Sequence, residues 1–413
     1  MKNIETIKNQ QSDYKNTYIV YGLIEKILDR KIRERIGLAE FGFIEVKLPN
    51  DFKVVHKGDK QGHHVYIHFK TWKSLFGYVL SGQLAFVEAF VKGDITVSCL
   101  PSLINWFLDN EPYFPEKQNH AASGLINRFS HLFLNDNSRN GSKKNISFHY
   151  DLGNDFYSLW LDKTMTYSAG DFAQTNDLEQ SQKDKYQRIS DQLDLSDGDR
   201  VLEIGCGWGG FAEHVLTKHH LDYRGITISK EQLDYALNRF NQITVRKNLA
   251  VFEDYRDTTG VYDKIVSIEM FEAVGEKHWD KYFQTLKSRL ASGGKAVIQV
   301  ITIDHDRFLK YRNRVDFIQK YIFPGGMLPS KEVFAEYARK SNLKIVDDYA
   351  FGNGYAETLI QWKKNFIANW PKIKELGFDE QFYRLWLYYL DYCIAGFERN
   401  TIDVMHFTMV HGR

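Results

Sequence analysis

Four glycines and an acidic residue mark the end of an apolar run in the segment VLEIGCGWGG, residues 201–210. Gly205, Gly207 and Gly210 fit the Gly-x-Gly-x-x-Gly pattern of a dinucleotide-binding loop. Counted from Glu203, the same segment fits Glu-x-Gly-x-Gly-x-Gly, the first motif of S-adenosylmethionine (AdoMet) methyltransferases. In both cases glycine lets the backbone approach a cofactor closely, and a helix expected from about Gly210 directs backbone N–H groups toward it. The loop therefore predicts a cofactor site for hydride or methyl transfer.

The next predicted strand separates these two alternatives. A nicotinamide enzyme usually carries an acidic residue about 20 positions after the loop, where it binds the ribose hydroxyls. The segment YRGITISKEQ instead offers Thr227, Ser229 and Gln232 at the strand end. Glu203 stands where methyltransferases keep the carboxylate that binds the amino-acid end of AdoMet. The sequence thus favours AdoMet as the cofactor.

Strand and helix patterns alternate around this loop. Helical patterns such as residues 230–240 and 279–290 separate segments that have the composition of strands. These strand segments are residues 199–205, 222–228, 249–255, 262–270, 294–302, 343–351 and 401–412. The alternation predicts an α/β, doubly wound, seven-stranded Rossmann-like sheet whose last strand is antiparallel. Two aromatic-rich helical segments, 304–341 and 351–400, are expected to form a cap beside the site.

A polar segment rich in Asn, Ser, Gly and Lys divides the chain. It predicts a linker at 134–145 between a small N-terminal domain (1–133) and a catalytic domain (146–413). Short strands and helical pieces in the first part indicate an α+β domain that we expect to associate with lipid. No metal site is predicted there, because no carboxylate or cysteine completes a ligand set with the histidines. These are His56, His63, His64 and His68.

Composition narrows the class of protein. The 413 residues are 43% apolar, enough for two or three domains with sizeable cores. Lys and Arg number 54 against 53 Asp and Glu, so the chain lacks the overall positive field of a nucleic-acid-binding protein. The N-terminus lacks the apolar core of a signal peptide, and no apolar run approaches the roughly 20 residues that cross a bilayer. We therefore expect a cytoplasmic protein.

Several longer segments resemble one family. They are FHYDLGNDFYSLWLDKTMTYSAG, VLEIGCGWGG, GITISKEQ, EDYRD, SIEMFEAVG, QKYIFPGGMLPS and YYLDYCIAGF. Over about residues 146–413 the chain is similar to the cyclopropane fatty acid synthases and mycolic acid cyclopropane synthases. The additional N-terminal domain resembles the arrangement of the bacterial phospholipid-acting members. The resemblance implies a peripheral enzyme that reversibly meets the inner face of the cell membrane and acts on unsaturated acyl chains in phospholipid. It leaves a homodimer open.

The resemblance also implies the reaction. In the family, the AdoMet methyl group passes to a cis double bond, and the resulting carbocation loses a proton from the new methyl group as a cyclopropane ring closes. A bicarbonate ion is the base, held by a Glu, a His, a Tyr and backbone N–H groups. Glu272 and Tyr389 match the family Glu and Tyr.

Two positions of that bicarbonate site differ from the family pattern. Ala169 replaces a cysteine of which the family uses the backbone N–H, and Gln299 replaces the histidine. Ile301 matches a position whose backbone N–H contacts the ion. Alanine still supplies an N–H, and glutamine still donates a hydrogen bond, so we expect a working bicarbonate site.

The AdoMet contacts carried over from the family cover four segments. They are Tyr167 and Ser168; Glu203, Gly205, Gly207 and Trp208; Thr227, Ser229 and Gln232; and Tyr255 with Arg256 near the adenine. The last two residues could instead only cap the third strand. The aromatic content of 15% suits a site that must stabilise a cation without attacking it.

Two other functions stay open. One is an AdoMet-dependent methyltransferase that gives a methyl-branched or methylene fatty acid without closing a ring. The other is a lipid-binding protein with a vestigial catalytic domain, suggested by Ala169 and Gln299. For membrane docking the sequence offers basic residues at 138–144 and a basic, aromatic segment at 308–323, which we expect to form a helix with one apolar face.

Overall fold

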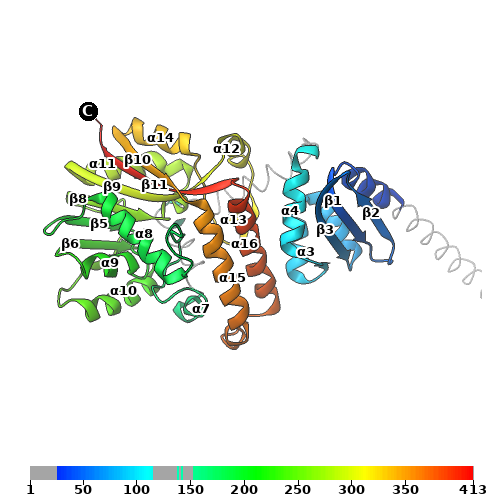
Figure 1. Cartoon of the computed structure of the whole chain (residues 1–413), viewed down its shortest axis with the longest axis horizontal. Helices are drawn as coiled ribbons and strands as arrows, with labels where there is room; N and C mark the ends of the chain where they lie inside the picture. The colour runs from blue at the N-terminus through cyan, green and yellow to red at the C-terminus, as the bar shows by residue number, and fades with distance from the viewer. Residues whose placement is uncertain (1–25, 115–136, 139–140, 143–151, 413) are drawn as a thin grey trace, which may run out of the picture. The chain divides into compact units, whose positions relative to one another are not determined.

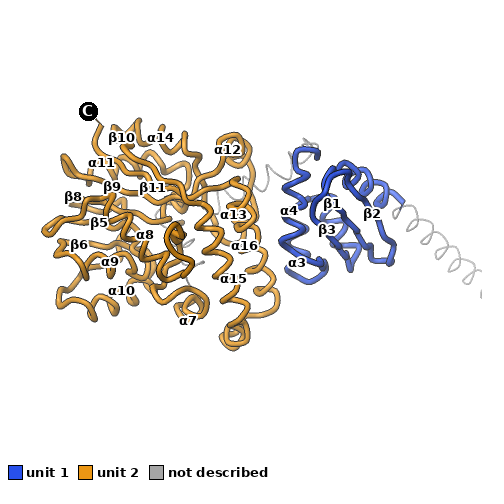
Figure 2. The backbone as a smooth tube through the Cα atoms, viewed as in Figure 1, with its two compact units in different colours: residues 1–120 blue, residues 121–413 orange. Residues whose placement is uncertain are grey.

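The computed structural model describes residues 26–114, 137–138, 141–142 and 152–412 (Figure 1). The chain forms two compact units, residues 1–120 and 121–413 (Figure 2). The expected boundary at residue 133 and most of the expected linker, 134–145, lie outside the described residues. That boundary therefore stays a prediction, as does the docking role of residues 138–144.

The first unit is a small α+β domain, as the sequence predicts. Its sheet has the strand order β2-β1-β3-β4, with β1 parallel to β3 and antiparallel to β2. The strands are β1 (Phe41–Lys47), β2 (Lys53–Lys57), β3 (Lys60–Phe69) and β4 (Ile95–Val97). Its helices include α2 (Trp72–Ser81), α3 (Gln83–Lys92) and α4 (Leu100–Asn110), and residues 26–36 are also helical. Ile44, Val46, Val65 and Ile67 alternate with less buried neighbours, so one face of β1 and β3 packs in the core.

The second unit contains the predicted seven-stranded sheet. Its order is β10-β11-β9-β8-β5-β6-β7, and β11 alone runs antiparallel to its neighbours β9 and β10. The strands are β5 (Arg200–Ile204), β6 (Asp222–Thr227), β7 (Ala250–Phe252), β8 (Tyr262–Ile268), β9 (Leu290–Ile303), β10 (Leu343–Ala350) and β11 (Ile402–His411). Each segment expected to be a strand in this half is one.

Helices cover both faces of this sheet (Figure 1). Neighbouring residues of a strand belong to different cores: Val201 and Val266 pack on one face, Leu202 and Ile265 on the other. The first core is closed by α8 (Leu178–Leu193), α9 (Gly210–Leu216) and α10 (Lys230–Ile243). The second is closed by α11 (Trp279–Arg289) and α14 (Lys331–Lys340). Because both faces are buried, the strands lack the polar alternation of a half-exposed sheet.

The cap is helical, as expected, but one part of it was predicted wrongly. Its helices are α7 (Asn154–Ser158), α12 (His305–Tyr311), α13 (Phe317–Tyr321), α15 (Gly352–Glu375) and α16 (Glu380–Glu398). The single helix expected at 308–323 breaks between α12 and α13. Asp316 begins α13 with a capping box, in which its side chain accepts from the Gln319 backbone N–H and the Gln319 side chain accepts in return. The aligned apolar face expected along 308–323 therefore does not form.

The strand order indicates where in the sheet the site lies. The chain moves outward from β5 to β6 and β7, then returns to the other side of β5 for β8 and β9. In open α/β sheets, ligands bind outside the carboxyl ends of the strands where the order reverses, here between β5 and β8. The register pairs Ile268 with Gln299 and Gln299 with His406, so residues that follow β8 lie beside the last residues of β9 and the first half of β11.

Candidate active site

The glycine loop follows β5 at this edge, and α9 begins at Gly210 as expected. Gly205 donates its backbone N–H to the Ile226 carbonyl at 2.9 Å, which joins the loop to β6. Gly207 has φ of 53°, and a Cβ added there would meet no protein atom within 4 Å. A side chain at this position would thus enter open space beside the loop. The loop leaves room for a ligand at the point where the sequence predicts AdoMet.

Glu203, at the end of β5, is only 3% exposed and accepts a hydrogen bond from the Tyr223 hydroxyl. Burial raises the pKa of Glu203 from 4.5 to about 8, although Tyr223 and the nearby Lys185 ammonium act in the opposite direction. A cationic ligand beside this carboxylate would favour its charged form. The amino group of AdoMet is such a ligand, so Glu203 and the open space at Gly207 fit this cofactor.

The other predicted cofactor residues of β6 and α10 form a local network. Ser229 is the N-cap of α10 and accepts from the Gln232 backbone N–H at 3.3 Å. The Thr227 hydroxyl accepts from the Ser229 N–H and lies 3.2 Å from Gln232 Oε1. All three side chains are buried. The network fixes the turn after β6; its contact with AdoMet stays a prediction.

Tyr255 and Arg256 follow β7. The Arg256 guanidinium forms two hydrogen bonds with Asp254, at 2.8 and 2.6 Å, and donates to the Asn137 carbonyl. Burial raises the pKa of Tyr255 to about 12, and its hydroxyl has no hydrogen-bond partner among the described residues. Arg256 therefore stabilises the turn after β7, whereas the hydroxyl of Tyr255 could form a hydrogen bond with a ligand.

Aromatic side chains join the loop to the cap. Trp208 donates its indole N–H to Asn154 at 2.6 Å, and its ring lies 5.1 Å from the Tyr157 ring. Tyr157 in turn contacts Tyr167, whose ring centroid is 5.2 Å from that of Trp362 on α15. The predicted residues Tyr167 and Trp208 therefore share one continuous aromatic cluster, which forms an apolar wall from the loop to the cap.

Ser168 lies on the other side of Tyr167 and is buried against α8. Its hydroxyl accepts from Lys185 Nζ at 2.6 Å, and its carbonyl accepts from the Gln182 side chain at 2.9 Å. Lys185 is fully buried, which lowers its pKa, while the nearby carboxylates of Glu269, Asp162 and Glu203 raise it. This lysine places a positive charge near two acidic groups of the site, and the sequence analysis did not identify it.

A carboxylate that the sequence analysis also missed occupies the centre of the predicted base site. Glu269 Oε1 accepts from the Ala169 backbone N–H at 2.8 Å and from the Gln299 side chain at 2.6 Å. Its Oε2 accepts from the Tyr355 hydroxyl at 2.7 Å. The structure therefore brings Ala169 and Gln299 together as predicted, but around a side chain of the protein.

Glu272 stands one turn further on and makes a separate contact. Its Oε1 accepts from the Ile301 backbone N–H at 2.6 Å, so these two predicted residues also meet. Its Oε2 is buried and has no partner within the described part of the chain. Burial is the main cause that raises the pKa of Glu272, and the neighbouring Glu269 carboxylate raises it further. Glu272 therefore accepts fewer hydrogen bonds than Glu269, and its charged form is less stabilised.

Tyr389, which the family resemblance assigns to the bicarbonate site, contacts the aromatic cluster. Its hydroxyl lies 2.7 Å from the Tyr167 hydroxyl, and within the described part of the chain no hydrogen bond joins it to Glu269 or Glu272. The tyrosine that reaches the Glu269 carboxylate is Tyr355, in the first turn of α15. Both tyrosines are on cap helices, and only the packing of α15 against the sheet shows which one reaches the strand ends.

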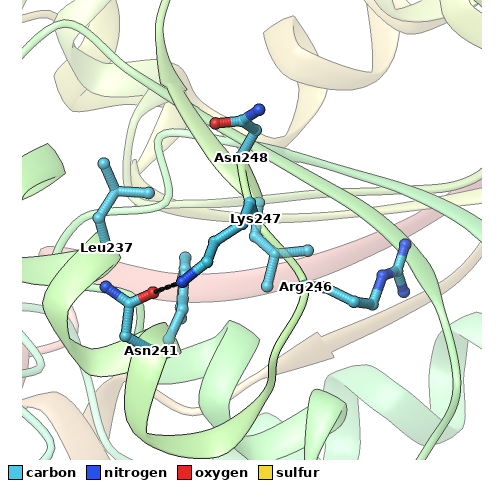
Figure 3. Close-up of a pocket in the computed structure, with 7 residues that line it drawn as sticks. Leu237, Asn241, Arg246, Lys247 and Asn248 are labelled. Carbon is cyan, nitrogen blue, oxygen red and sulfur yellow. Dashed lines mark hydrogen bonds between the residues drawn. The ribbon is translucent and has the colours of Figure 1, made fainter.

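A shallow hollow between α10 and β7 contains none of these residues (Figure 3). In it, Lys247 donates to Asn241 at 3.1 Å. Its lining residues are Leu237, Phe240, Asn241, Arg246, Lys247, Asn248 and Leu249. The hollow has no part in the candidate site.

Comparison with known proteins assigns this geometry to a family. The family model for mycolic acid cyclopropane synthetase matches residues 137–407, which include the loop, both glutamates and the cap. The chain belongs to the mycolic acid cyclopropane synthetase family. It is thus an AdoMet-dependent methyltransferase of the cyclopropane synthase type, as the sequence predicts.

Three relatives cover much of the chain. Tuberculostearic acid methyltransferase of Mycobacterium tuberculosis is 38% identical, over 80% of this chain and 79% of its own length. Cyclopropane-fatty-acyl-phospholipid synthase of Escherichia coli is 37% identical, over 64% of this chain and 67% of its own. A mycolic acid cyclopropane synthase solved with SAH and CTAB is 30% identical, with a TM-score of 0.59, over 65% of this chain and 97% of its own.

Bicarbonate, which the family resemblance implies as the base, does not fit the residues of this chain. The Ala169 N–H and the Gln299 amide donate to Glu269, and the Ile301 N–H donates to Glu272. The carboxylate charge of Glu269 at this place also repels a further anion. The donors predicted for bicarbonate are therefore satisfied by side chains of the protein itself.

The sequence did contain a signal for Glu269. The segment SIEMFEAVG has acidic residues at positions 269 and 272, directly after a buried strand, where functional residues of such sheets gather. Only Glu272 was assigned a role, since only it matched the family motif. Lys185 gave no comparable signal, because a lysine within a polar helical segment is ordinarily exposed.

Proposed function

We propose that this enzyme transfers the methyl group of AdoMet to the cis double bond of an unsaturated acyl chain in membrane phospholipid and converts it to a cyclopropane ring. The observation that carries this proposal is the hydrogen-bonded carboxylate of Glu269, beside a loop with room for AdoMet. Methylation of an alkene leaves a carbocation that must lose a proton, and a fixed carboxylate at the strand ends suits that need.

The aromatic wall supports a reaction through a cation. AdoMet supplies an electrophilic methyl group when bound. Tyr157, Trp160 and Trp362 are each fully buried around Tyr167, so they exclude water from that side of the site. Aromatic faces attract positive charge without forming a bond to it. The CTAB bound by the related mycolic acid cyclopropane synthase is also consistent with a site for a long apolar chain.

Phospholipid as the substrate requires contact with a membrane. No described helix is both long and apolar enough to cross a bilayer. We propose reversible docking at the cytoplasmic face through α12 and α13. These helices and the turn between them carry exposed basic residues, and the Leu309 side chain on α12 is 52% exposed. These residues are Lys310, Arg312, Arg314 and Lys320. Anionic lipid attracts each nearby Lys or Arg by about 1 kcal/mol.

A second candidate function has support of its own. The tuberculostearic acid methyltransferase covers 80% of the chain, against 64% for the cyclopropane-fatty-acyl-phospholipid synthase. An enzyme of that kind transfers the same methyl group to a fatty acid but gives a branched or methylene product. In the cyclopropane and methylene reactions alike, the new methyl group loses a proton. They differ in whether the C–H electron pair closes a ring or, after a hydride shift, forms a double bond, and they share the AdoMet loop and the lipid site.

Expression in a bacterium that makes unsaturated phospholipids but no cyclopropane lipids separates these functions. Mass spectrometry of the extracted lipid should show acyl chains heavier by one methylene group, and proton NMR should show ring protons. Olefinic methylene or branched-methyl signals would instead support the second candidate. Unchanged acyl chains, in cells that contain the folded protein, would contradict both and favour a lipid-binding protein without activity.

A further inference from the structure

The hydrogen bonds that the Glu269 carboxylate accepts resemble those of a bound anion. Three donors from three parts of the chain converge on this carboxylate: the Ala169 N–H, the Gln299 amide and the Tyr355 hydroxyl. The first two are positions that the family resemblance assigns to the bicarbonate ion. A side-chain carboxylate has the same planar arrangement of two oxygens, and so can accept the same hydrogen bonds.

The backbone of Glu269 is held in an unfavourable conformation. Its φ is 49°, in the left-handed region that favours glycine. Its own N–H donates to the Gln299 carbonyl at 2.9 Å, which continues the β8–β9 pairing by one residue and fixes this geometry. Such strain in a non-glycine residue costs on the order of 1–3 kcal/mol and is concentrated at functional sites.

The charges around Glu269 favour ionisation of this member of the acidic pair. Burial raises its pKa, which makes the carboxylate a stronger base, while the Ala169 N–H and the Lys185 ammonium lower it. Glu272 accepts one backbone hydrogen bond and has an Oε2 without a partner among described residues. When the pair holds a single proton, Glu269, which accepts three hydrogen bonds, carries the charge and Glu272 keeps the proton.

We propose that Glu269 is the catalytic base of this enzyme and takes the place that bicarbonate has elsewhere in the family. The inference rests on the proposed function. In the step that involves Glu269, the alkene π electrons form a bond to the methyl carbon, and the C–S bond breaks with its electron pair left on sulfur. Glu269 then removes a proton from the new methyl group, and the C–H electron pair closes the ring. The carboxyl group afterwards releases the proton to water.

The test is an assay of purified protein with AdoMet and unsaturated phospholipid vesicles, in buffer freed of carbon dioxide, with and without sodium bicarbonate. Sodium chloride matches the ionic strength. We expect the wild type to give product at the same rate in both buffers. Glu269→Gln should lower kcat by at least about 100-fold, the usual lower range for loss of a general base, while calorimetry shows unchanged AdoMet affinity.

Glu269→Gly gives a second, independent readout. Glycine suits the positive φ, so this variant should fold, and it frees the three donors for an external anion. We expect this variant to be nearly inactive without bicarbonate. Added bicarbonate should raise its kcat at least about 10-fold. Full activity of either variant without bicarbonate would overturn the inference.

The outcomes separate the inference from the function on which it rests. A wild type that makes methylated lipid only when bicarbonate is added would overturn the role of Glu269 and leave the proposed function standing. A wild type that makes no methylated lipid in either buffer, although it binds AdoMet, would contradict the proposed function and the inference with it.

Discussion

His406 on β11 lies opposite Gln299 on β9 in the sheet, and its Nε2 is 3.0 Å from Gln299 Oε1. Both side chains are fully buried. Burial holds the pKa of His406 well below its ordinary range, so the ring is neutral and donates from one nitrogen only. Its Nδ1 lies 2.9 Å from Gln192 Oε1, so the neutral ring donates to one of two amide oxygens. In the tautomer with the proton on Nε2, the ring holds the amide oxygen of Gln299 and directs the NH₂ group at Glu269. His406 is therefore a positioning residue for the proposed base.

Replacement of His406 with leucine should weaken this arrangement. The Gln299 oxygen would be left unpaired, which costs about 1–3 kcal/mol of folding stability. The amide could then turn away from Glu269, and the loss of that hydrogen bond would raise the carboxyl pKa. We expect the rise of kcat with pH, on the acid side of the plot, to move to higher pH. The titratable groups near Glu269 that also affect this pH are Glu272, Lys185 and Tyr355. His406→Asn, which retains a donor, should move it less; equal profiles for all three proteins would contradict the positioning role.

Glu272 should matter less for turnover than Glu269. Glutamine at position 272 can still accept from the Ile301 N–H, and its NH₂ group resembles the protonated carboxyl that we expect there. We predict that Glu272→Gln keeps AdoMet affinity and lowers kcat by about 10-fold or less, against at least about 100-fold for Glu269→Gln. Steady-state kinetics of the two variants measures this difference, and the reverse order would assign the base to Glu272.

The glycine loop should lose AdoMet when Gly207 becomes valine. The side chain would enter the open space that we assign to the cofactor, and calorimetry should detect no binding at concentrations that saturate the wild type. Gly198→Val is the matched control. Gly198 also has positive φ, and a Cβ there meets nothing within 4 Å, so the variant carries comparable backbone strain outside the loop. Equal AdoMet affinity in both variants would exclude this loop as the cofactor site.

The free protein should lose stability with rising pH because of Glu203. Its pKa rises from 4.5 to about 8 on folding, so between these values the folded state binds a proton that the unfolded state lacks. The stabilisation is fully present below pH 4.5 and is lost as pH rises through about 8. Each unit of pKa shift corresponds to at most about 1.4 kcal/mol. Thermal unfolding of Glu203→Gln should depend less on pH in this range, whereas Glu375→Gln, at an exposed site, should match the wild type.

Membrane docking should depend on charge at α12 and α13. Arg312 pairs with Glu276, so a variant that reverses Lys310, Arg314 and Lys320 to Glu leaves this ion pair intact. We expect vesicles of anionic phospholipid to bind it on the order of 100-fold more weakly at low salt, with AdoMet affinity unchanged. Reversal of Lys218, Lys230 and Lys247, exposed residues near α9 and α10, is the control with equal charge change. Equal sedimentation of both variants with vesicles would exclude this surface.

The sheet could be predicted from the sequence because its signals are local. Apolar runs such as 262–268 are bounded by polar turns, and the glycine loop marks the end of β5. The break between α12 and α13 was missed because an apolar periodicity continued across Asp316, whose capping box depends on a residue three positions later.

The arrangement of the base could not be predicted for a different reason. Whether Glu269 reaches Ala169 and Gln299 depends on a positive φ and on the β8–β9 register, which no local pattern shows. Tyr355 and Tyr389 both lie in aromatic helices, and only the packing of the cap decides which hydroxyl meets the carboxylate. The sequence thus predicted which segments meet at the site but not which atoms form hydrogen bonds with one another.

The central claim is that the transferred methyl group loses a proton as the ring closes on an acyl chain. AdoMet with a fully deuterated methyl group, mixed with the enzyme and unsaturated phospholipid vesicles, tests it in one measurement. Mass spectrometry of the product should show acyl chains that have gained the methyl carbon with all but one of its deuterium atoms, and NMR should place that carbon in a ring. Acyl chains that keep every deuterium, or that gain no label while AdoMet is bound, would contradict the account.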